Sequence, residues 1–118
     1  MEIPENALLL RAFIGEEDKW QHTPLYEAIV LKAREAGLAG ATILRGPMGF
    51  GASSHIHTAK ILRLSMDLPL VVEIVDAEEK IEAFLPLLKP MMDGGLLTLE
   101  KVRVLHYRPK GGAEGRTS

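Results

Sequence analysis

The chain has 118 residues, of which 47% are hydrophobic and 25% are charged, which suits one domain with one core. Its 14 basic and 16 acidic residues are mixed along the sequence and give a formal net charge of -2, which argues against a nucleic-acid partner. There is no cysteine, no basic leader and no apolar run of about 20 residues, so we expect a soluble, cytoplasmic protein without disulfides or membrane insertion.

The first element is predicted to be a strand over residues 7–14. One face carries Leu8, Leu10, Ala12 and Ile14, and the other carries Ala7, Leu9, Arg11 and Phe13. A small antiparallel sheet usually leaves one face to water, but both faces of this strand are largely apolar. The second face therefore predicts burial against a partner subunit.

A loop over 15–22 leads to the first predicted helix. Thr23 is a good N-cap, and Pro24 suits the first helical position, where its missing N–H costs nothing. Gly37 supplies the C-terminal stop. A second strand is predicted over 40–45.

A glycine-rich loop follows this strand, opened by Gly46, Gly49 and Gly51. Such glycines leave backbone amides exposed and allow positive φ, which lets a loop wrap an anion or a close-packed partner. We expect function in this loop, and the alternative is a plain turn. The pattern over 56–66 fits either a strand or a short helix, so the conformation of 52–66 is left open.

The second half of the chain predicts a strand, a helix and a strand. The first of these spans 70–75. The helix is predicted to begin at Asp76, with Glu79 completing a capping box, and Pro86 predicts a kink or an early end. The last strand is predicted over 96–107.

The element order βαββαβ predicts an α+β, ferredoxin-like fold: a four-stranded antiparallel sheet with two helices on one face. The first and third strands would then be neighbours, which places Arg11 beside Glu73 on the uncovered face. This domain is assigned to residues 1–108. The polar, glycine-rich stretch 109–118 is predicted to be a disordered tail.

Three stretches carry a family resemblance. They are GLAGATILRGPMGFG, DLPLVVEIVD and MDGGLLTLEKVRVLHYR, and they resemble the second strand with its loop base, the third strand, and the turn with the fourth strand of the nitrogen-regulatory PII signalling proteins. With GEEDKWQHTPLYEAI and IHTAKILRLS, the chain is similar, more closely still, to a PII-like family of unknown function. The match covers nearly the whole chain in order.

The resemblance implies a compact homotrimer whose uncovered sheet faces meet around the threefold axis. It also implies clefts between subunits that hold a small effector, which in PII is an adenine nucleotide. A protein of this kind would regulate a partner such as a membrane transporter or an enzyme.

Functional positions of PII match particular residues of this chain. The base of the effector-sensing loop corresponds to Gly49, Phe50 and Gly51, the phosphate-cradling turn to Asp93 and Gly94, and two cationic positions of the last strand to His106 and Arg108. Three positions depart from PII: Gly95 stands for a lysine, His106 for an arginine and Ser53 for a glutamine. Each change removes a donor aimed at phosphate, worth about 1.5–3 kcal/mol when charge-assisted, so ATP binding in the PII manner is left open.

We therefore predict a regulatory protein, not an enzyme, that binds a small anionic effector between subunits. Fixed positive charge with open backbone amides suits such a ligand, for example an adenine nucleotide. The predicted binding residues are Arg45, Gly49, Phe50, Gly51, Ser53, Ser54, His55, Asp93, Gly94, Gly95, His106 and Arg108.

Two other functions stay open. A trimeric metal-binding protein would use the imidazoles of His22, His55, His57 and His106. A small cleft enzyme would use the acidic run Glu16, Glu17 and Asp18, or a serine at 53 or 54 beside His55. Because the chain lacks cysteine and the serines lack an oriented base, we assign no metal ligand and no catalytic residue.

Overall fold

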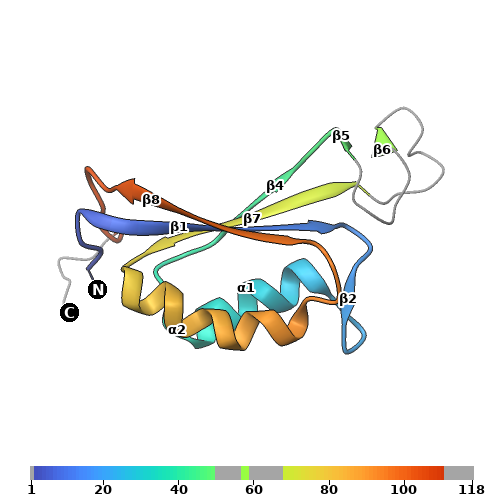
Figure 1. Cartoon of the computed structure of the whole chain (residues 1–118), viewed down its shortest axis with the longest axis horizontal. Coiled ribbons are helices and arrows are strands. Elements are labelled where there is room, and N and C mark those ends of the chain that lie inside the picture. Colours follow the sequence, from blue (N-terminus) through green and yellow to red (C-terminus); the bar gives the residue numbers. More distant parts are fainter. Residues whose placement is uncertain (1, 50–56, 59–67, 111–118) are drawn as a thin grey trace.

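The computed structural model describes residues 2–49, 57–58 and 68–110. Four antiparallel strands form one sheet in the order β4-β7-β1-β8, and both helices lie on the same face of it (Figure 1). The elements are β1 (Asn6–Gly15), α1 (Leu25–Glu35), β4 (Thr42–Arg45), β7 (Pro69–Asp76), α2 (Glu78–Leu88) and β8 (Leu96–Arg103). The predicted ferredoxin-like fold is confirmed.

The core lies between the sheet and the helices. Alternate residues of β1 and β7 point into it, and they meet the apolar stripes of α1 and α2. Leu10, Ile29 and Phe84 are among its fully buried side chains. This packing fixes the sheet on the two helices and leaves its other face turned away from them.

The uncovered face carries an apolar row, formed by Leu44, Val71, Phe13 and Leu96. These residues stand directly opposite one another in register, one from each strand. Leu44, Phe13 and Leu96 are 48%, 36% and 55% exposed. The structure thus confirms that the first strand has apolar residues on both faces. The apolar row extends across all four strands of the sheet.

A charged group occupies the next row of the same face. Arg11 Nε donates to Glu73 Oε2 at 2.9 Å, and Arg11 Nη1 donates to Glu100 Oε1 at 2.9 Å. The hydrogen bond that Arg11 donates to Glu73, and then the one it donates to Glu100, raise the pKa of Arg11 above its usual value. The predicted Arg11–Glu73 neighbourhood is confirmed, and Glu100 extends it.

The first helix starts later than predicted. Pro24 is its N-cap, without a side-chain cap hydrogen bond, and Leu25 is the first helical residue. The N-cap assignment of Thr23 was wrong because Thr23 pairs with Trp20 in a small hairpin of β2 (Lys19–Trp20) and β3 (Thr23–Pro24). Gly37 follows the helix with φ 81, so the predicted stop is confirmed.

The second helix also differs from its prediction. Asp76 is the last residue of β7 and is fully buried, and α2 begins at Glu78 after the N-cap Ala77. The capping box with Glu79 is therefore wrong, because the Asp76 carboxylate binds other amides. Pro86 lies inside the helix, which continues to Leu88 and into the 3-10 turn η1 (Lys89–Met91), so the early end was wrong.

The last strand is shorter than predicted and ends at Arg103. Val104 N–H still donates to Glu5 O at 2.7 Å, just before β1. The next residue in that direction is Pro4, which has no N–H to continue the ladder. The second strand likewise begins at Thr42 rather than at residue 40. Residues 111–118 of the predicted tail lie outside the described residues.

The glycine loop starts with a two-stranded ladder. β5 (Met48–Gly49) pairs with β6 (His57–Thr58), with Gly49 opposite His57. The other residues of 52–66, for which the sequence left a strand or a short helix open, lie outside the described residues.

Candidate functional site

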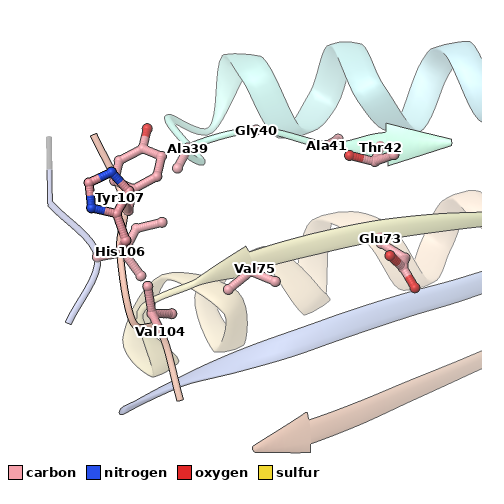
Figure 2. A pocket seen from close by; sticks show the side chains of 10 residues that line it. Ala39, Gly40, Ala41, Thr42, Glu73, Val75, Val104, His106 and Tyr107 are labelled. Carbon is pink, nitrogen blue, oxygen red and sulfur yellow. The ribbon is translucent and has the colours of Figure 1, made fainter. Parts of the chain in front are cut away.

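A pocket lies at the end of the sheet where β1 begins and β7 and β8 end. Its cavity volume is about 420 Å³. The wall on one side is the segment 39–42, the floor includes residues of β7, and the other side is the chain after β8 (Figure 2). Pockets of roughly 300–1,000 Å³ are typical of small-molecule sites.

Four side chains give the pocket its polar character. Glu73 and Thr42 come from neighbouring strands at opposite register positions, whereas His106 and Tyr107 come from the segment after β8. Figure 2 shows the His106 and Tyr107 rings beside each other at the end of the pocket near Ala39. Carboxylate, hydroxyl and imidazole groups thus line one cavity.

The carboxylate in this pocket has a cationic partner within the chain. Glu73 accepts from the guanidinium of Arg11 at 2.9 Å, and its side chain is partly buried. An opposite charge at hydrogen-bond distance offsets the field that a lone carboxylate would direct at an anionic ligand. Arg11 also binds Glu100, so this group of one guanidinium and two carboxylates keeps a net negative charge. The pocket therefore offers Glu73 as a hydrogen-bond acceptor for hydroxyl groups and not as a neighbour for phosphates.

The wall opposite is built from small residues. Ala39, Gly40 and Ala41 line the cavity, and a Cβ added at Gly40 would meet nothing within 4 Å. Val75 and Val104 supply apolar surface. A flat, partly apolar molecule bearing hydroxyl groups fits this combination.

The predicted site residues that the structure describes lie at two opposite ends of the sheet. His106 lines the pocket, and Arg108 is an exposed residue two positions further on. Arg45 and the turn ending at Gly95 lie at the opposite end, because Leu96 pairs with Phe13 near the end of β1 whereas Arg103 pairs with its start. Their convergence between neighbouring subunits stays a prediction.

Several predicted residues have a definite structural setting. Arg45 forms an ion pair with Glu16, and the neighbouring Gly46 N–H donates to Pro69 O at 2.8 Å. These contacts hold the base of the glycine loop. The remaining loop residues of the prediction, Phe50, Gly51, Ser53, Ser54 and His55, lie outside the described residues.

Gly95 explains one departure from PII. Its φ is 89, and a Cβ at this position would approach Phe13 O to 2.5 Å. A side chain in this backbone is therefore excluded, so a lysine does not fit here.

The acidic run after β1 forms a second, smaller hollow of about 210 Å³ with Lys19, Pro24 and Tyr26. Its members have structural partners: Asp18 Oδ2 accepts from Gly15 N–H at 2.9 Å, and Glu16 binds Arg45. Within the described ranges, no group of three or more His, Cys, Asp or Glu side chains is arranged to hold a metal ion.

The pocket contains residues that sequence reasoning missed. Glu73 was placed beside Arg11 but not in a cavity, and neither the 39–42 wall nor Tyr107 was assigned to a site. Tyr107 was missed because it was assigned to the last strand. The alternation of residues along a strand does not predict the path of the chain after the strand ends. The available signal was the small-residue stretch Ala39-Gly40-Ala41 before β4, which leaves open space beside the backbone.

The fold is similar to that of PII-like proteins of known structure. A structure of CPII, a nitrogen regulatory PII-like protein from Thiomonas intermedia K12 bound to ADP, AMP and bicarbonate, is similar with a TM-score of 0.65 and 17% identity, covering 84% of this chain and 88% of CPII. CPII bound to ADP and bicarbonate gives a TM-score of 0.56 at 18% identity and the same coverage. At these identities the likeness concerns the fold.

The chain belongs to the DUF190 family, described as an uncharacterized ACR, which matches residues 7–104. A UPF0166 protein of Aquifex aeolicus (strain VF5) is 42% identical over 98 residues, which cover 83% of this chain and 92% of the relative. One from Methanocaldococcus jannaschii is 32% identical over 99 residues, covering 83% and 91%. In the described ranges, the helices are too short or too polar to cross a membrane.

Proposed function

We propose that this chain is a PII-like regulatory protein that binds an adenine nucleotide at the pocket between β4, β7 and the segment after β8. The observation that carries the proposal is the cavity of about 420 Å³ lined by Glu73, Thr42, His106 and Tyr107. It occurs in a fold shared with CPII, whose structure holds ADP, AMP and bicarbonate.

The pocket chemistry supports the base and ribose of such a ligand better than its phosphates. Valines and small residues suit a flat base, and Glu73 with Thr42 suits hydroxyl groups. In the described part of the pocket lining, His106 is the one side chain of a basic residue type. The phosphates would reach toward His106 and the following Arg108, or toward cations of a neighbouring subunit.

We also propose that the functional assembly is a homotrimer. The apolar row on the uncovered face needs a cover, and another copy of the chain provides an equivalent surface. In a trimer, the Arg45 and Gly95 end of one subunit would face the pocket of the next. This would join the two separated groups of predicted residues.

In this proposal the nucleotide is a signal and not a substrate. Its binding would change the surface offered to a protein partner in the cytoplasm, such as a transporter or an enzyme. A bound and unchanged nucleotide after prolonged incubation, measured by chromatography of the recovered ligand, is the expected outcome.

Titration calorimetry tests the binding site. AMP and ADP, each with and without bicarbonate, should bind the wild type, and Gly40→Leu should weaken AMP binding about tenfold or more by filling the cavity. Ala83→Leu adds similar bulk on an exposed part of α2 and should leave binding unchanged.

Two outcomes would contradict the proposal: no binding of either nucleotide to the wild type, or equal effects of the two leucine substitutions. A titration with zinc alone separates the metal-binding alternative. Saturable zinc binding without nucleotide binding would favour that alternative.

A further inference from the structure

Asp76 is a buried carboxylate at the end of β7. Its residue is 0% exposed. Oδ2 accepts from the backbone N–H of Ala39 at 2.8 Å, and Oδ1 accepts from the backbone N–H of Ala77 at 2.7 Å. Burial of a carboxylate is costly unless its oxygens are hydrogen-bonded, so these two bonds account for its place in the fold.

The two donors belong to segments with different roles. Ala39 begins the small-residue wall of the pocket, and Ala77 is the N-cap of α2. A second link joins the same regions, because Lys80 Nζ donates to Gly37 O at 3.4 Å. A negative charge beside the start of a helix is also favourable. One side chain thus connects the pocket wall to the first turn of α2.

We propose that Asp76 is a positioning residue of the pocket, which holds the 39–41 wall in place and transmits occupancy of the pocket to the first turn of α2. A ligand that presses on the wall moves the N–H of Ala39, and the carboxylate passes this change to Ala77. The exposed carboxylates of Glu78 and Glu79 then shift with the turn. The transmission rests on the proposed function, whereas the anchoring of the wall does not.

The substitution Asp76→Asn separates anchoring from packing. The amide has nearly the same shape but one acceptor oxygen in place of two, so one backbone donor loses its partner. Amide hydrogen exchange followed by NMR should show Ala39 or Ala77 exchanging about tenfold faster or more in the variant without ligand. The amide of Gly46, which binds Pro69 O, should be unchanged.

AMP is the probe for transmission. In the wild type, AMP should slow exchange at both Ala39 and Ala77. In Asp76→Asn its affinity should fall about tenfold, and the response at Ala77 should be lost. Ile29→Val is the matched control, because it loosens the buried core of α1 without touching either hydrogen bond.

Each result decides a part of the proposal. If Asp76→Asn only lowers the melting temperature, as Ile29→Val does, with AMP affinity and the Ala77 response intact, Asp76 has no positioning role. If neither AMP nor ADP binds the wild type, the proposed function is wrong and the transmission is wrong with it. The exchange rates without ligand still decide the anchoring, which unchanged rates at both amides would overturn.

Discussion

At the scale of single residues, backbone geometry constrains Gly95 more than chemistry does. Its φ of 89 and the 2.5 Å approach of an added Cβ to Phe13 O both require glycine. We expect Gly95→Ala to lower the free energy of unfolding by about 1–3 kcal/mol. Gly94→Ala is the neighbouring control, since its Cβ would meet nothing within 4 Å. Urea unfolding at one protein concentration measures both, and equal losses would contradict the argument.

At the scale of elements, the sequence predicted what periodicity controls and missed what tertiary hydrogen bonds control. The four strands of the main sheet and the two helices were found because their apolar faces repeat, whereas the β2–β3 hairpin was missed inside the predicted loop 15–22. Arg11 lies beside Glu73 because the topology makes their strands neighbours. The start of α2 was missed because Asp76 binds Ala39, a residue 37 positions away. The pocket was missed because its three walls come from separate segments. Among the predicted residues that the structure describes, only His106 lines it.

The β2–β3 hairpin is the element whose local sequence fits its conformation least well. Its tip residues Gln21 and His22 have φ of 50 and 70, a conformation that favours Asn-Gly in two-residue hairpin turns. We expect Gln21→Asn with His22→Gly to raise the free energy of unfolding by about 1 kcal/mol, because left-handed backbone costs side-chain-bearing residues about 1–2 kcal/mol each. His22→Val should lower it. Thermal unfolding of the three proteins checks this, and a stabilising valine would show that the tip does not adopt this turn.

At the scale of the whole molecule, we predict that assembly uses the sheet face away from the helices. The apolar row of Leu44, Val71, Phe13 and Leu96 spans all four strands, and full burial of one Leu or Phe side chain contributes about 1.5–3 kcal/mol. Light scattering should therefore return about three times the 13.0 kDa mass of the chain.

Leu96→Glu places a charge in the row, and we expect it to yield monomers, because an unpaired buried carboxylate costs more than the lost contact. Leu31→Glu is the matched control, since Leu31 is 54% exposed against 55% for Leu96 but lies on α1, in the helix layer. A monomeric wild type would contradict the proposed trimer and leave the pocket without a neighbouring subunit. Dissociation by Leu31→Glu alone would place the interface on the helix layer.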